Sequence, residues 1–161
     1  MSLQFDEDFE RLFRTELPRL FRYLDRLSGE PDLAADLVQE AFVRLHRRGE
    51  MPERPQLWLV TVALNLFRNA RSTDSRRRRL LTGWAGSLSP PASPTGIEEG
   101  ESPSRVRAAL KRLPSRDREM LLLRAEGYSY REISEALELR EASVGTLLAR
   151  AKRAFREVYE G

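Results

Sequence analysis

The residues in this sequence that are best suited to chemistry are arginines and amides gathered in residues 65–79. Six arginines stand against a single acid, Asp74, between positions 68 and 79. Guanidinium groups bind phosphates and release counterions, which gives an affinity that falls steeply with salt. The amides of Asn65 and Asn69 lie four positions apart and can pair with the edge of a base. This pattern predicts a surface for a nucleic acid, although exposed basic runs are often only solvated.

A second group of polar residues lies in residues 127–155. Ser129 can cap a short helix, and a turn of three or four residues then leads into a longer helix. Two helices across such a turn present the second helix to the major groove of DNA, although an ordinary helical hairpin gives the same pattern. The residues placed for phosphate or base contacts are Arg131, Ser143, Gly145, Thr146, Leu147, Arg150 and Arg153.

These two groups lie in separate folded blocks. Residues 82–103 are rich in Pro, Gly and Ser and contain neither Arg nor Lys. Such a segment buries too little apolar surface to offset its ordering entropy, so it is predicted to be a flexible linker. The chain is therefore divided into a block of residues 1–81, the linker and a block of residues 104–161.

Both blocks are expected to be helical, which makes this an all-α protein of two small domains. Apolar residues follow helical spacing from residue 5 to residue 27, and Pro18 is expected to kink this helix or to start a second one. Residues 32–48 and 57–71 predict two more helices of a small bundle. In the second block, Ser115 is expected to cap a helix that ends near Gly127.

The composition argues against several classes of protein. The chain has no cysteine and one histidine, so thiolate metal sites are excluded and no metal is expected. Neither a Gly-rich phosphate loop nor an acid–base constellation is present in the sequence, and we expect no cofactor and no enzymatic activity. No apolar run approaches the roughly 18 residues of a membrane span, and the acidic N-terminus does not resemble a signal peptide. The expectation is a cytoplasmic protein without membrane insertion.

The segment LPSRDREMLLLRAEGYSYREISEALEL and the later RAKRAF resemble region 4 of extracytoplasmic-function sigma factors. The resemblance implies that this helix-turn-helix contacts the upstream, minus-thirty-five promoter element. The chain has Glu138 where the family usually has glycine in the turn, and a positive φ there would strain a residue that carries a side chain. At the start of the recognition helix, Gly145 and Leu147 stand where family members often have basic contacts.

The segment GEPDLAADLVQEAFVRLHR resembles region 2.2 of the same family. That resemblance implies docking on the coiled coil, or clamp helices, of the β′ subunit of core RNA polymerase. The solvated face of an ordinary amphipathic helix would carry similar charged residues. The residues implicated in core binding are Asp36, Leu37, Gln39, Glu40, Phe42 and Arg44.

The segment PQLWLVTVALNLFRNAR resembles regions 2.3 and 2.4, which capture single-stranded bases of the minus-ten element. By this resemblance, residues 48–56 line the pocket of an extruded base. Amides can pair with a base edge, and stacking contributes roughly 1–3 kcal/mol per base. Plain core packing is an equal alternative for Trp58. The implicated residues are Trp58, Asn65, Arg68, Asn69, Arg71, Arg76 and Arg77.

The sequence is thus identified as a member of the extracytoplasmic-function sigma factors, with regions 2 and 4 joined by a linker that lets the blocks span two promoter elements. The implied function is to bind core RNA polymerase and to direct promoter-specific transcription initiation. The implied partners are the β′ clamp helices, the β flap, promoter DNA with its single-stranded minus-ten region, and an anti-sigma factor. A polymerase-independent helix-turn-helix regulator is the alternative, but it leaves the region 2.2 segment unexplained.

Overall fold

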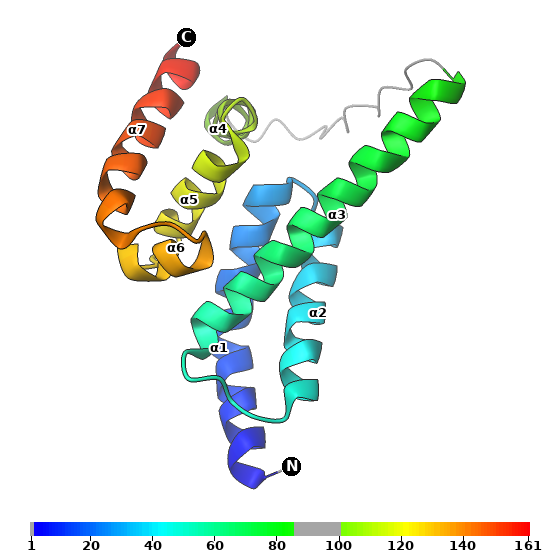
Figure 1. The fold of residues 1–161 in the computed structure, drawn as a ribbon, viewed down its shortest axis with the longest axis vertical. Coiled ribbons are helices and arrows are strands. Elements are labelled where there is room, and N and C mark those ends of the chain that lie inside the picture. The colour runs from blue at the N-terminus through cyan, green and yellow to red at the C-terminus, as the bar shows by residue number, and fades with distance from the viewer. Residues whose placement is uncertain (1, 86–100) are drawn as a thin grey trace.

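The computed structural model describes residues 2–85 and 101–161, and it confirms that the protein is all-α (Figure 1). Within these residues, the first block contains three helices, the second block contains four, and no strand is present. The helices are α1 (Leu3–Ser28), α2 (Pro31–Arg48), α3 (Pro55–Ala85), α4 (Glu101–Lys111), α5 (Ser115–Ala125), α6 (Tyr130–Ala136) and α7 (Glu141–Glu160). The middle of the predicted linker, residues 86–100, lies outside the described residues, and its two ends belong to α3 and α4.

Helix α1 is one continuous helix, so the second helix that Pro18 could have started does not exist. The Ser2 hydroxyl caps its first turn by accepting a hydrogen bond from a backbone N–H. Gly29 closes it in the left-handed conformation at φ 69°, which costs glycine little. A proline inside a helix loses a hydrogen bond at a cost of about 3 kcal/mol. Here Leu12 and Leu20, on either side of Pro18, are buried in the same core, and that packing offsets the loss.

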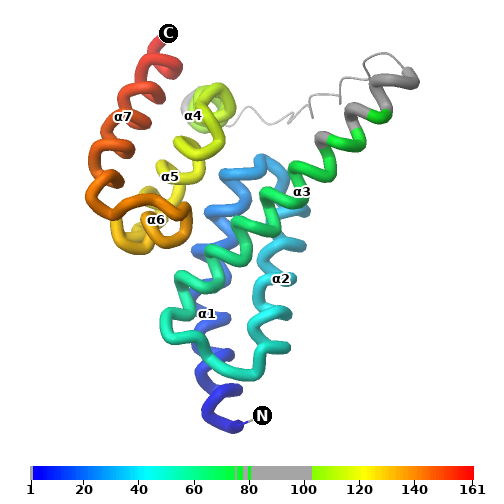
Figure 2. The backbone as a smooth tube through the Cα atoms, viewed as in Figure 1, coloured from blue at the N-terminus to red at the C-terminus, as the bar shows by residue number. Residues whose placement is uncertain are grey.

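Helices α1, α2 and α3 pack on one another to form a small bundle, which the backbone trace shows clearly (Figure 2). Their shared apolar faces follow the helical spacing predicted from the sequence. Side chains buried to 1% exposure or less come from each of the three helices. They are Leu20, Tyr23, Leu24, Ala34, Val38, Ala41, Leu45, Leu59, Val60, Ala63 and Leu64.

Helix α3 is much longer than the predicted segment 57–71 and spans 31 residues. Arginine is a strong helix former, and neither glycine nor proline interrupts residues 56–82. The helix therefore continues through the arginine run, and it projects beyond α1 and α2 (Figure 1). Arg76 and Arg77 are exposed on this extension.

The caps of the second block follow the sequence in one case and not in the other. Ser129 caps α6 as predicted, because its hydroxyl accepts the N–H of Glu132 and the Glu132 carboxylate accepts the N–H of Ser129. The prediction for Ser115 is wrong, since Pro114 occupies the cap position and Ser115 is the first helical residue. The extended backbone of Pro114, with ψ 146°, ends the preceding turn and makes this residue the boundary.

The turn between α6 and α7 contains a strained residue. Glu138 has φ 56°, and among the described residues it is the one non-glycine residue with a positive φ. The strain that the sequence predicted at this position is therefore confirmed. A residue with a Cβ pays roughly 1–2 kcal/mol for this conformation.

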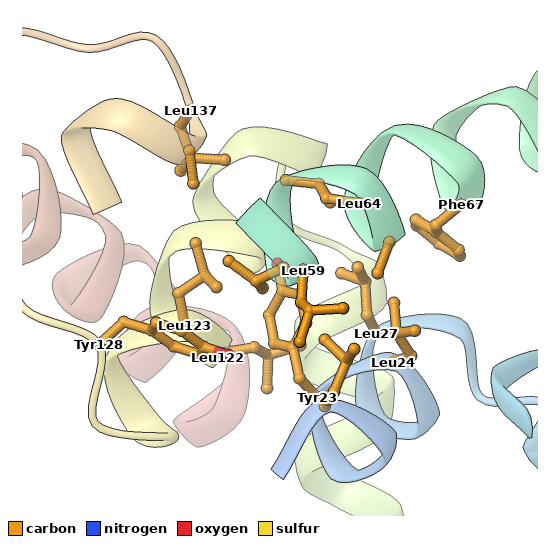
Figure 3. Packing of buried hydrophobic residues seen from close by; sticks show 14 of the residues in the cluster. Tyr23, Leu24, Leu27, Leu59, Leu64, Phe67, Leu122, Leu123, Tyr128 and Leu137 are labelled. Carbon is orange, nitrogen blue, oxygen red and sulfur yellow. The ribbon is translucent and has the colours of Figure 1, made fainter. Parts of the chain in front are cut away.

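The two blocks pack directly on each other, which the sequence did not predict. Helix α1 contacts α5, α3 contacts α6, and the buried apolar residues of both blocks form one cluster. Figure 3 shows Tyr23, Leu59, Leu122 and Leu123 meeting at this contact. Tyr23 is fully buried and donates its hydroxyl to the backbone carbonyl of Glu119 over 3.2 Å.

Replacing Glu138 with glycine should raise the free energy of unfolding by about 1 kcal/mol, because glycine adopts a positive φ without a Cβ clash. Urea unfolding followed by circular dichroism measures the change. The matched control is Glu7→Gly on the exposed face of α1, where glycine should lower the same free energy by about 1 kcal/mol. A loss of stability in both variants would contradict the strain at Glu138.

Burial, followed by the nearby Glu119 carboxylate, holds the pKa of Tyr23 well above its usual value. A raised folded-state pKa means that the unfolded chain ionises first, so stability present at lower pH is lost as the pH rises past about 10. Tyr23→Phe should cost about 1 kcal/mol near neutral pH, through the lost hydrogen bond. It should also flatten the alkaline loss. Urea unfolding curves near neutral pH and above about pH 10 measure the free energy of unfolding of both proteins. If wild type and Tyr23→Phe differ by the same free energy at the two pH values, ionisation of Tyr23 does not cause the alkaline loss.

Candidate functional site

The α2 face that the sequence assigned to a protein partner contains both exposed and buried residues. Asp36, Gln39 and Arg44 are exposed, and Glu40 accepts a hydrogen bond from Arg44 over 3.1 Å. By contrast, Leu37 and Phe42 are 8% and 3% exposed. Leu37 belongs to the core of the bundle, so the polar residues are the ones available at the surface.

Beside this polar face, α1 and α2 enclose an apolar groove of about 780 Å³. In it the Phe42 ring packs edge to face against both Phe9 and Phe13, with the Phe13 and Phe42 centroids 5.0 Å apart, while Phe9 and Phe13 stack on each other. Phe13 is 39% exposed, which is high for a large apolar side chain. The groove was not predicted, although the unusual breadth of the apolar stripe on residues 5–27 was a signal for it. Its lining also includes Leu17, Phe21, Val38, Gln39, Val43, His46 and Arg47.

The residues assigned to the minus-ten strand form a stripe along α3. Asn65, Asn69 and Arg76 are exposed and recur at four- and seven-residue intervals, which places them on one face of the helix. Trp58 is half-buried at the start of this stripe, with the Arg48 guanidinium 5.9 Å from its ring centroid. Trp58 therefore packs against the core cluster while part of its surface stays exposed. Arg71 and Arg77 are also exposed, but helical spacing places Arg77 at the flank of the stripe and Arg71 on the opposite side of the helix from Asn69.

Arg68 has a different environment from the rest of this set. Its guanidinium donates two hydrogen bonds to the Glu119 carboxylate of α5, over 3.1 and 2.7 Å. These hydrogen bonds raise the pKa of Arg68. The Glu119 side chain is only 5% exposed, whereas that of Arg68 is 43% exposed. The structure thus uses this arginine to join the two blocks.

A small hollow of about 240 Å³ lies where α1 meets the loop of residues 49–54. Met51, Pro55 and Gln56 line it, and all three belong to the segment that the resemblance assigned to an extruded base. Helix α1 contributes the other wall, which the sequence analysis missed because these residues are distant in the chain. That wall consists of Asp8, Arg11, Leu12 and Thr15. The same loop is tied to α6 through an ion pair between Arg54 and Glu135.

The recognition helix α7 presents part of the predicted set. Thr146, Arg150 and Arg153 are exposed on one face, and Ser143 is half-buried beside them. Leu147 is half-buried and packs against the core cluster. Arg131 of α6 is exposed, and its Nε lies 3.4 Å from the Oε1 of Glu135. Two exposed basic residues of α7, Lys152 and Arg156, were missed by the sequence analysis, although their charge was a sufficient signal.

The part of the chain that the structure describes offers neither a metal-binding group nor a membrane-spanning helix. No group of histidine, aspartate or glutamate there is arranged to hold a metal ion. None of the helices formed by residues 2–85 and 101–161 combines the length and apolar character needed to cross a membrane.

Two protein families match the two blocks. The family described as sigma-70 region 2 matches residues 12–85. The family described as sigma-70, region 4 matches residues 104–155. The first range begins inside α1 and covers the rest of the α1–α3 bundle, and the second lies within the α4–α7 block.

Similar whole proteins carry the same description. The ECF RNA polymerase sigma factor EcfG of Rhodopseudomonas palustris is 36% identical, with 86% of this chain and 76% of the relative covered. The RNA polymerase sigma factor CarQ of Myxococcus xanthus is 32% identical over 94% of this chain and 87% of its own. Among solved structures, the sigma factor RpoE of Bartonella quintana, in complex with the anti-sigma factor NepR, shares the fold with a TM-score of 0.74. It is 24% identical and covers 96% of this chain and 98% of its own.

Gly145→Ala should stabilise the protein by about 1 kcal/mol, because alanine favours the helix and a Cβ finds ordinary space. The nearest atom outside the helix would be a ring carbon of Tyr130 at 3.5 Å. Thermal unfolding measures the gain, and Ala149→Gly on the exposed face of α7 serves as the inverse control. A destabilised Gly145→Ala variant would show that Tyr130 cannot accommodate the methyl group.

Proposed function

Because the chain belongs to the extracytoplasmic-function sigma factors of the sigma-70 family, which bind core RNA polymerase and direct initiation at specific promoters, we propose that it divides this work among three surfaces. The α1–α2 side binds the core enzyme. The α3 stripe and its neighbouring hollow bind the opened minus-ten strand. The exposed face of α7 binds the upstream duplex. The observation that carries the proposal is the aromatic groove beside the polar face of α2.

The groove suits a helical partner such as the β′ clamp helices. Stable interfaces combine aromatic or aliphatic anchors in a pocket with a polar rim. Here Phe13 supplies apolar surface inside the groove and the buried Phe42 ring packs against it, while Gln39 and Arg47 lie at the edge of the groove. Asp36 and Glu40 extend the polar rim along α2. An amphipathic helix laid in the groove would bury the exposed part of Phe13 and meet this rim.

The α3 side suits a single strand rather than a closed duplex. Asn65 and Asn69 offer amides that can pair with base edges. Arg71, Arg76 and Arg77 supply positive charge for the phosphates that follow. The hollow at residues 49–56 has apolar walls and polar side chains at hand, which suits one extruded base. Asp8, Arg11 and Gln56 are then the side chains positioned to select that base.

The upstream contact rests on α7 and α6. Arg150 and Arg153 are exposed for phosphates, and Thr146 can reach a base edge. Leu147 packs against the protein core, so its role in reading bases is limited to its exposed edge. Lys152 and Arg156 widen the basic surface beyond the predicted residues.

Further partners and the setting follow from the same assignment. We expect the second block to meet the β flap, and an anti-sigma factor to bind this chain as NepR binds the solved relative. Such a protein acts in the cytoplasm, where core polymerase and promoter DNA are found, and binds without catalysing a reaction. A polymerase-independent regulator gives the first block no role, although residues 12–85 match a sigma-70 region.

A pull-down of core RNA polymerase tests the first surface. Gln39→Ala/Glu40→Lys should lower core affinity at least about tenfold, because it removes a polar contact and reverses a charge at a desolvated interface. Both positions lie outside the buried core, so circular dichroism should be unchanged.

Glu157→Lys, on the far block, is the matched charge control and should retain the core enzyme. Equal retention of wild type and double variant would place the core contact elsewhere on the molecule. If no form of this chain binds core polymerase while another sigma factor does, the function itself is refuted.

A further inference from the structure

Arg118 of α5 is a buried cation whose charge no described side chain balances. It is 7% exposed, and its Nε has no hydrogen-bond partner within residues 2–85 and 101–161. Burial lowers the pKa of Arg118, and the positive charge of Arg71 on α3 lowers it further. A charge withdrawn from water is costly unless a partner compensates it. The environment of Arg118 therefore favours an anion beside it.

The carboxylate next to Arg118 in the chain is already engaged. Glu119 raises the pKa of Arg118, so its charge acts in the compensating direction. Both oxygens of Glu119, however, accept hydrogen bonds from Arg68, over 3.1 and 2.7 Å. A carboxylate held by the two nitrogens of one guanidinium is used on both oxygens. The hydrogen bond that Arg118 lacks is thus left to a group other than Glu119.

A second arginine approaches the same place from α3. Arg71 follows Arg68 by three positions, so helical spacing places it one turn further along the side of α3 that meets α5. Its guanidinium carbon lies 5.6 Å from the ring centroid of the buried Phe67. The ring limits where the Arg71 side chain can go, while its exposure leaves its donors available. Two guanidinium groups therefore share one region without a free acid between them.

The first turn of α5 adds backbone donors to this region. Pro114 occupies the cap position and makes no side-chain cap, and Ser115 is the first helical residue. The first N–H groups of a helix lack partners inside the helix and carry partial positive charge. Arg118 lies three positions after Ser115, and helical side chains lean toward the N-terminus, so its guanidinium points back over this turn. The acid of the same turn, Asp117, projects about 100° away from Arg118 around the helix.

We propose that Arg118, Arg71 and the first turn of α5 form a binding site for the phosphate group of a small molecule. The ligand is inorganic phosphate or a nucleotide that carries a terminal phosphate. A phosphate accepts hydrogen bonds from guanidinium groups and from helix N–H groups at the same time. The burial of Arg118 favours a small ligand over the phosphates of a duplex backbone, which contact exposed side chains. The site goes beyond the proposed function and does not depend on it.

The test is thermal unfolding of the whole chain while inorganic phosphate replaces chloride at constant ionic strength. A ligand that binds the native state raises Tm as its concentration rises, and the affinity follows from the curve. Wild type should show a rise that saturates. Arg71→Gln should bind phosphate about tenfold more weakly, because it removes one charged donor. Arg76→Gln is the matched control on α3, exposed and with the same change of charge, and should keep the wild-type affinity.

Arg118→Met tests the buried charge itself. An apolar side chain of similar length in place of a buried charge is often stabilising, so this variant should unfold at a higher temperature than wild type in chloride buffer. Its Tm should not respond to phosphate, and the difference from wild type should shrink as phosphate saturates the site. If Arg118→Met does not fold, the comparison of Arg71→Gln with Arg76→Gln decides the question.

Adenosine diphosphate in the same titration separates the two sources of the phosphate group. Binding at least about tenfold tighter than that of inorganic phosphate identifies a nucleotide, and equal binding identifies the phosphate group alone. Either result supports the site. A Tm that rises equally in wild type and in the Arg71 and Arg76 variants is a general effect of the salt and overturns it. A wild-type Tm that responds to neither ligand overturns it too. Core polymerase takes no part in this experiment, so a failure of the proposed function leaves its outcome unaffected.

Discussion

The buried carboxylate of Glu119 is the interaction on which the arrangement of the two blocks depends. Both oxygens of the Glu119 carboxylate accept hydrogen bonds from Arg68 of the first block. The backbone carbonyl of Glu119 accepts another from the hydroxyl of Tyr23. A carboxylate withdrawn from water is costly unless it is paired, and losing one partner of such a pair leaves the other uncompensated. One residue of α5 thus links α1 and α3 through two independent hydrogen-bonding groups.

Apolar side chains pack around the hydrogen bonds of Glu119 and Tyr23. The buried residues of both blocks form one cluster, in which Leu59 lies near Leu122 and Leu123 (Figure 3). Because water is largely excluded there, the hydrogen bonds of Glu119 and Tyr23 are stronger than they would be at the surface. The same packing tolerates local costs, namely the positive φ of Glu138 and the Nε of Arg118, which has no hydrogen-bond partner within residues 2–85 and 101–161. Proteins often retain such costs at functional places, and both of these lie in the second block near the contact.

The surfaces of the molecule differ in how available they are in this conformation. The α1–α2 groove and the polar face of α2 are open, and the exposed arginines of α7 face away from the core of their block. On α3, by contrast, Asn65 and Asn69 are exposed while Arg68 is already paired. The surface proposed for the strand on α3 therefore shares one residue, Arg68, with the contact between the two blocks.

The sequence by itself determined the helices, the cap at Ser129, the strained turn at Glu138 and the family, because these depend on spacing and residue type over short stretches. It placed the exposed residues of α2, α3 and α7 in three groups, which the structure keeps apart on three helices. Only the tertiary structure decided which of those residues are buried or already paired with another side chain. Leu37 is buried, Arg68 is bound to Glu119 fifty-one positions away, and the aromatic groove needs both α1 and α2. Pairings of that range follow from how helices pack, and a periodic pattern specifies which face is apolar but not which partner covers it.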